Sequence, residues 1–202
     1  MFGTPMAGSA SSGRGLAVDR RRFRATAGVA GVIAAVVLGG IVVDALIPAP
    51  SAGTRNVGPN VTITAASGWV LATDASAPGH GVMLQKGDAT LTAEVLSSQF
   101  SGDSTRMMDQ VKQELASQVA QISYGDEHQT RISGNDTTYV LFEAIVSGSG
   151  PASGNGGTVD GEVVCMVVAG NAVVVEVDAP QGDLQYVTSD VSAMIQTVRA
   201  AR

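Results

Sequence analysis

An uncharged, apolar run at residues 25–43 is the feature that most constrains how this chain of 202 residues folds. Its 19 residues include one polar side chain, that of Thr26. A helix needs about 20 apolar residues to cross roughly 30 Å of hydrocarbon, and a surface helix of a globular domain would show a polar face that this run lacks. Pro48 then cannot continue a helix. We therefore predict a transmembrane helix over residues 25–47, in contact with membrane lipid.

Basic residues flank the run on its N-terminal side only. The four arginines that set the predicted orientation are Arg20, Arg21, Arg22 and Arg24. After the run, Arg55 is the single basic residue within twenty positions. The positive-inside rule then predicts a cytoplasmic N-terminus and an extracytoplasmic C-terminal part of a single-pass cell-membrane protein. The expected segments are a basic disordered tail over 1–24, the helix over 25–47, a linker over 48–59 and a domain over 60–202.

Two further interpretations of this segment stay open. A cleaved signal peptide would have the same basic start, although its apolar region is usually 7–15 residues long, and 49–51 is a passable cleavage site. Small residues also recur every four positions along the run, a spacing that permits a dimer through the helix. They are Ala27, Gly31, Ala35 and Gly39. A run rich in Ala, Gly and Val also produces this spacing by chance.

Charge separates the tail from the rest of the chain. Residues 1–24 carry a net charge of +4, whereas the chain from residue 45 onward has 7 basic and 16 acidic side chains, a net charge of −9. Phosphate binding needs clustered Lys and Arg, so the acidic part argues against a nucleic-acid partner. Cys165 is the single cysteine, which excludes an intramolecular disulfide.

Hydrophobic periodicity predicts two helices and several hairpins. Apolar residues recur at helical spacing over 108–122 and over 184–198, after candidate N-caps at Asp103 or Ser104 and at Asp183. Turn residues at 86–88, 134–135 and 170–171 separate strand-like runs. In the run over 90–96, apolar residues alternate with Thr92, Glu94 and Leu96, which predicts a strand with one buried face. The fold class expected is α+β, a mainly antiparallel sheet flanked by two helices and preceded by the transmembrane helix.

This order of elements resembles the PsbP-like fold, in particular its LpqN-type branch in the cell envelope of actinobacteria. The resemblance rests on the opening 61–72 with Ser67-Gly68-Trp69 at a turn, the hairpin 82–96, the helix 107–122, the strands 137–146 and 159–177, and the helix 183–198. It implies an α/β/α sandwich and a binding or accessory role in the envelope. LpqN-type proteins are generally lipoproteins, and this chain lacks a lipid-attachment cysteine, so it departs from them in its anchoring.

The chain offers no clear catalytic or metal-binding constellation. Cys165, His128 and Asp160 would be the components of a Cys-His-Asp set, but Cys165 lies in the apolar run VVCMVV and is better interpreted as a core residue. His80 and His128 are 48 positions apart, and the adjacent Asp126, Glu127 and His128 cannot all point one way on a strand. We expect no catalytic site, metal or cofactor.

Two features are candidates for binding. One is a glycine-rich loop, whose glycines are Gly148, Gly150, Gly154, Gly156 and Gly157. It lacks the Lys-Ser/Thr ending of a phosphate-binding loop, so it is either a hairpin connection or a binding loop. The other is Trp69, which is either a binding anchor or a core residue beside the Gly68 turn.

The sequence therefore indicates a non-catalytic, membrane-anchored envelope protein. We expect it to act as a binding or accessory module for another envelope or membrane protein. The alternative function is a carrier or sensor of a lipid or small apolar ligand, which requires an apolar pocket of several hundred Å3, of the order typical of ligand sites.

Overall fold

The computed structural model describes residues 53–72, 81–146 and 157–201. The elements in chain order are β1 (Thr54–Gly58), β2 (Val61–Thr64), β3 (Val70–Leu71), β4 (Val82–Lys86), β5 (Ala89–Ser98), α2 (Ser104–Gln118), β6 (Gln121–Tyr124), β7 (His128–Ile132), β8 (Asn135–Val146), β9 (Gly157–Val168), β10 (Asn171–Pro180), α3 (Leu184–Gln196) and β11 (Arg199–Ala200). The α+β class predicted from the sequence is confirmed for this part of the chain.

One large antiparallel sheet dominates the domain. Its strand order is β3-β4-β5-β10-β9-β8-β6, and β7 continues the outer edge beside β6 by pairing with the first half of β8. A smaller sheet has the order β1-β2-β11. The long strands β8, β9 and β10 pair in register over nearly their whole length, as expected for consecutive hairpins. The β7–β8 hairpin turns at Ser133-Gly134 and the β9–β10 hairpin at Ala169-Gly170. Both central residues of each turn have positive φ, which matches the right-handed twist of the strands.

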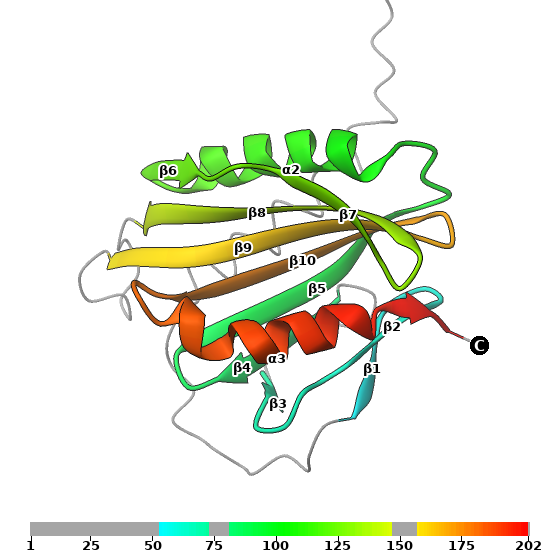
Figure 1. The fold of residues 1–202 in the computed structure, drawn as a ribbon, viewed down its shortest axis with the longest axis horizontal. Helices are drawn as coiled ribbons and strands as arrows, with labels where there is room; N and C mark the ends of the chain where they lie inside the picture. Colours follow the sequence, from blue (N-terminus) through cyan, green and yellow to red (C-terminus); the bar gives the residue numbers. More distant parts are fainter. Residues whose placement is uncertain (1–52, 73–80, 147–156, 202) are drawn as a thin grey trace, which may run out of the picture.

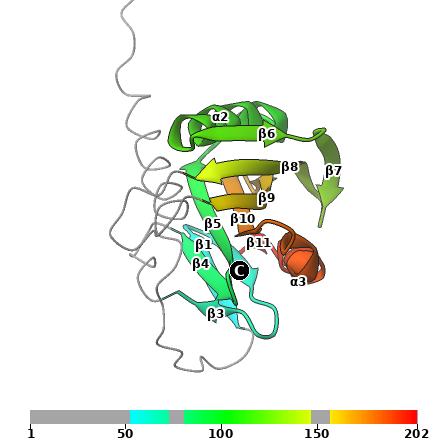
Figure 2. The ribbon, with the colours of Figure 1, turned by 90° about the vertical axis from the view of Figure 1, so that its left-hand side faces the viewer.

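The helices pack on opposite faces of the large sheet (Figures 1 and 2). On one face, Met108, Val111 and Leu115 of α2 pack against the inward side chains of β8, β9 and the start of β10. On the other face, α3 and the smaller sheet cover β10 and β5, and Val191 and Met194 are fully buried there. The sheet is therefore covered on both faces at its centre, which explains the nearly continuous apolar runs of β9 and β10.

Two boundaries differ from the sequence predictions. Thr54–Gly58 forms β1 against β2, so part of the expected linker over 48–59 belongs to the folded domain. The helix predicted to reach residue 122 ends at Gln118, and Ile122 lies on β6. Ile122 still packs on the core beneath α2. The apolar periodicity therefore continues past the end of α2, because Ile122 of β6 points into the same core as the apolar residues of the helix.

The predicted transmembrane segment lies outside the described residues. This applies to residues 25–47, to the small residues within them, and to Arg20, Arg21, Arg22 and Arg24. Neither helix of the part that the structure describes is long and apolar enough to span a membrane.

Candidate functional site

Part of the sheet face that carries α3 is covered by neither α2 nor α3. Helix α3 packs mainly on β10, β5 and β2, and its C-terminal end contacts the β7–β8 turn, where Ser133 Oγ donates to the Gln196 carbonyl at 2.6 Å. The outward residues of β6, of the second half of β8 and of the first half of β9 lie beyond this contact. We call this surface the open face. Its residues are Gln121, Ser123, Leu141, Glu143, Ile145, Thr158, Asp160 and Glu162.

Two large aliphatic side chains are exposed on the open face. Leu141 and Ile145 on β8 are 52% and 44% exposed. They alternate with Val140, Phe142 and Ala144, which point to the other face and are buried beneath α2. They are four positions apart on the strand, which is about 13 Å at roughly 3.3 Å per residue. The pair is therefore an apolar strip along the centre of the open face.

Carboxylates line this strip without a basic neighbour on the same strands. Glu143 lies directly opposite Asp160, and Glu162 lies directly opposite Leu141. No Lys or Arg occurs in β6, β8, β9, β10 or α3. Like charges opposite one another destabilise a strand pair. The open face thus combines apolar surface with uncompensated negative charge.

The Asp160 carboxylate is partly engaged within the domain. Its Oδ2 accepts from the Gly182 amide at 2.6 Å, which fixes the turn before α3. Its Oδ1 is buried and has no hydrogen-bond partner among the described residues. Burial raises the pKa of the neighbouring Glu162 above its ordinary value. A positive charge brought to the exposed side of the Glu162 carboxylate would favour its ionised form.

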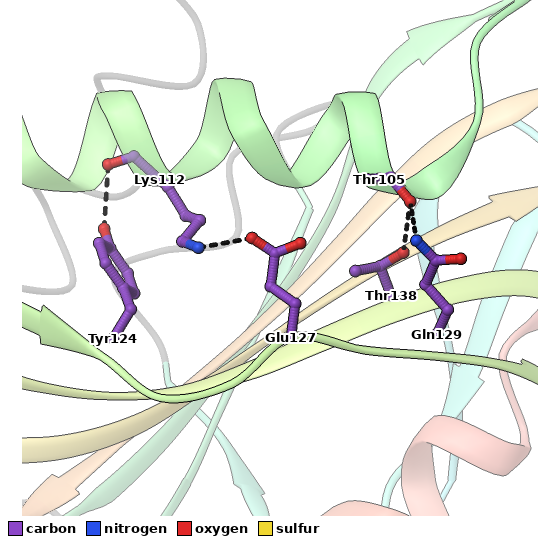
Figure 3. A network of polar contacts seen from close by, with 6 residues as sticks. All are labelled: Thr105, Lys112, Tyr124, Glu127, Gln129 and Thr138. Carbon is purple, nitrogen blue, oxygen red and sulfur yellow. Dashed lines mark hydrogen bonds and ion pairs between the residues drawn. The ribbon is translucent and has the colours of Figure 1, made fainter.

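A polar network on the opposite side holds the edge strands in place (Figure 3). Lys112 of α2 pairs with Glu127 at 2.6 Å and lies 4.8 Å from the centroid of the Tyr124 ring, while the Tyr124 hydroxyl donates to the Lys112 carbonyl. Gln129 donates to Thr105 at 2.8 Å. The network ties β6 and β7 to α2, so the open face has a fixed edge before any partner binds.

A second acidic group lies inside the domain, on the α2 side of the sheet. Glu94 on β5 and Glu176 and Asp178 on β10 are all buried and lie on one face of adjacent strands. Thr92 lies directly opposite Glu176. Within the described part of the chain, the Thr92 hydroxyl, Glu176 Oε1 and both Asp178 carboxylate oxygens have no hydrogen-bond partner. Burial raises the pKa of Glu94 and of Asp178 to about 7. Burial, with Asp178 and Glu94 nearby, raises the pKa of Glu176 well above its ordinary value.

This buried group was not predicted from the sequence. The alternation over 90–96 places Thr92 and Glu94 on the exposed side of a strand, whereas their exposed fractions are only 4% and 8%. Strand β5 is central in the sheet and flanked by β4 and β10. The alternation of apolar and polar residues along β5 does not show which side chains other elements cover. It therefore could not show that both faces of this strand are buried.

The structure separates the residues considered for catalysis. Cys165 is buried on the α2 side, where desolvation raises the pKa of its thiol. His128 stacks on Tyr139 with ring centroids 5.1 Å apart, on the face opposite Cys165. Asp160 lies an odd number of positions from Cys165 on β9 and therefore also points to the opposite face. The three do not converge.

The structure describes only some of the metal and loop candidates. Across 53–72, 81–146 and 157–201, no group of three His, Cys, Asp or Glu side chains could hold a metal ion. His80, Gly148, Gly150, Gly154 and Gly156 lie outside the described residues. Gly157 is the first residue of β9 and pairs with Val146.

Trp69 belongs to the core. It is 4% exposed, and its Nε1 donates to Asp190 Oδ2 at 3.2 Å, while Lys86 pairs with the same oxygen at 2.6 Å. Of the two interpretations of Trp69, the structure supports a core residue and not a binding anchor. The contact joins β3 and β4 to α3.

Two hollows lined by described residues are open and partly polar. One of about 420 Å3 lies at the smaller sheet, and its lining residues are Thr54, Asn56, Thr62, Arg199, Ala200 and Ala201. This lining is not the apolar pocket that a lipid carrier requires.

Comparison with known proteins identifies the fold and no more. No known family profile and no curated protein sequence matches the chain. Among solved structures, cyanobacterial PsbP (CyanoP) from Synechocystis sp. PCC 6803 is similar with a TM-score of 0.50 and 13% identity, over 80% of this chain and 99% of that one. LpqN, involved in cell envelope biogenesis of Mycobacterium tuberculosis, gives 0.49 and 13% over 75% and 91%. The similarity to CyanoP shows that the domain has a PsbP-like fold.

Proposed function

We propose that this chain is a non-catalytic, membrane-anchored protein of the cell envelope, and that its domain docks onto another envelope or membrane protein. The observation that supports this most is the open face. An exposed aliphatic pair on a rigid sheet, bordered by carboxylates, is the kind of surface that a partner covers.

The sequence supports the rest of the proposal. The predicted transmembrane helix over 25–47 anchors the chain, and the four preceding arginines orient it with its C-terminal domain outside the membrane. The Gly68-Trp69 turn, the element order and the Ala- and Val-rich composition favour the LpqN-type branch and an actinobacterial envelope. Pairing of two chains through Ala27, Gly31, Ala35 and Gly39 stays a prediction.

The proposal contains no chemical step. The one thiol is buried and separated from His128 and Asp160 by the sheet. The carrier alternative is not favoured by any observation on the described residues, because the two cores are filled by Val, Met, Leu and Ile side chains.

Cross-linking in the native membrane tests this function. The full-length chain, with a C-terminal tag, is cross-linked, purified in mild detergent and analysed by mass spectrometry. We expect one membrane or envelope protein to be linked reproducibly through the folded domain. Recovery of the chain alone with one tightly bound lipid would support the carrier function instead, and recovery with neither would reject both.

A further inference from the structure

We propose that the open face binds a basic, amphipathic segment of a protein partner, with apolar side chains on Leu141 and Ile145 and Lys or Arg side chains against Glu143 and Asp160. This inference rests on the proposed function and specifies the chemistry of the partner. It is carried by the charge of the face, by the spacing of its apolar residues and by its rigidity.

Two carboxylates of the open face lie directly opposite each other. Glu143 and Asp160 face one another across β8 and β9, and like charges in this arrangement destabilise a strand pair. Glu162 adds a third carboxylate at the next residue pair along the same face. An amine or guanidinium between Glu143 and Asp160 would turn this repulsion into two charge-assisted contacts.

The spacing of the two aliphatic side chains sets the length of the ligand. Leu141 and Ile145 lie about 13 Å apart along one strand. Apolar residues eight positions apart lie on the same side of a helix and are separated by about 12 Å, at about 1.5 Å per residue. A metal ion or a free amine would leave both side chains exposed. The face therefore fits a peptide segment that carries apolar and basic residues together.

The carboxylates that border the apolar strip favour a protein partner over a membrane surface. Phosphate headgroups would meet three carboxylates and no Lys or Arg on β6, β8 or β9. The open face also has a fixed edge strand. On the opposite side of the sheet, contacts among Lys112, Tyr124 and Glu127 hold this edge against α2. A rigid surface loses little conformational entropy when it binds.

The test measures binding of defined peptides to the full-length chain in phosphatidylcholine nanodiscs, with empty nanodiscs as the blank. Two labelled helical peptides of about 18 residues have the same leucines, eight positions apart on one face, and differ in having Lys or Glu elsewhere. Fluorescence anisotropy gives their affinities at about 0.05 and 0.3 M salt. We expect binding of the Lys peptide alone, and weaker binding at the higher salt.

Paired variants locate the binding site. Leu141→Ser with Ile145→Ser removes the apolar strip, and Tyr186→Ser is its control, because Tyr186 is 73% exposed and lies one helical turn before Asp190, on the side of α3 that faces β3 and β4. Glu143→Lys reverses a charge on the face, and Asp109→Lys does so on the exposed side of α2. We expect at least about a tenfold loss of affinity for the two variants of the open face and less than about a twofold change for the controls.

Stability measurements keep the test interpretable. Glu143→Lys replaces the like-charge pair with an opposite-charge pair, so its melting temperature should equal or exceed that of the wild type while its binding is lost. Equal binding of both peptides, equal losses in the control variants, or stronger binding of the domain to phosphatidylglycerol vesicles than to the Lys peptide would each overturn the inference. If the peptides fail but a partner is cross-linked in the membrane, the proposed function stands and this inference does not.

Discussion

Three buried carboxyl groups dominate the energetics at the scale of single residues. Glu94, Glu176 and Asp178 lie on strands that carry no Lys or Arg, so each is more easily held as the neutral acid. A carboxyl group whose pKa is raised in the folded state binds a proton there that the unfolded chain releases. Such a group does not destabilise the folded state at a pH below the pKa that it has in the unfolded chain. As the pH rises from that value toward the pKa in the folded state, the free energy of unfolding falls.

The Glu176→Gln variant tests this at the most deeply buried position. We expect it to melt at a higher temperature than the wild type at pH 8 and at nearly the same temperature near pH 4.5. The slope of wild-type stability against pH should be negative over this window, by up to about 1.4 kcal/mol per pH unit for each extra bound proton. The emission of Trp69, the one tryptophan and a buried one, reports unfolding directly. A wild-type slope unchanged by Glu176→Gln would contradict this account, and the exposed Asp109→Asn is the control.

At the scale of elements, the two helices begin at aspartates that differ in role. Asp103 has extended backbone angles, and its carboxylate accepts from the Arg106 amide at 2.8 Å. Asp183 has helical backbone angles and makes no side-chain capping bond. Asp103→Ala should therefore destabilise the domain by about 1 kcal/mol, whereas Asp183→Ala should change little. Thermal melts of the two variants check this, and equal losses would show that the caps are equivalent.

The sequence predicted the elements with a strong local signal and missed those without one. The stripes of α2 and α3 and the β4–β5, β7–β8 and β9–β10 hairpins were predicted because helical spacing and turn residues mark them. Strands β1, β6 and β11 are two to five residues long and largely polar. They form because a neighbouring strand supplies their hydrogen bonds, which is a tertiary effect.

The open face could not be predicted for a related reason. The sequence marks 137–146 as a strand but not which apolar residues another element covers. Leu141 and Leu91 are both strand leucines, yet Leu91 is fully buried and Leu141 half exposed, because α3 and the smaller sheet cover β5 and do not reach the second half of β8. Coverage depends on where helices pack, and periodicity does not encode it.

At the scale of the whole molecule, the proposed topology has a direct test in intact cells. Asp88 lies at the exposed β4–β5 turn, and Ser12 lies in the predicted cytoplasmic tail. Asp88→Cys should react with a membrane-impermeant maleimide in intact cells, and Ser12→Cys only after permeabilisation. Cys165 is buried and should stay unlabelled in the folded protein. Labelling of Ser12→Cys in intact cells would contradict the predicted cytoplasmic position of the N-terminus.

Photo-cross-linking from the open face in the native membrane tests the central claim most directly. A photoreactive residue at position 145 places the probe beside Leu141 and Glu143, and the same residue at position 186 serves as the matched exposed control. We predict that position 145 forms a cross-link to one other protein, at a segment containing Lys or Arg among apolar residues, and that position 186 does not. Equal cross-linking from both positions, or cross-links from position 145 to lipid alone, would contradict the account.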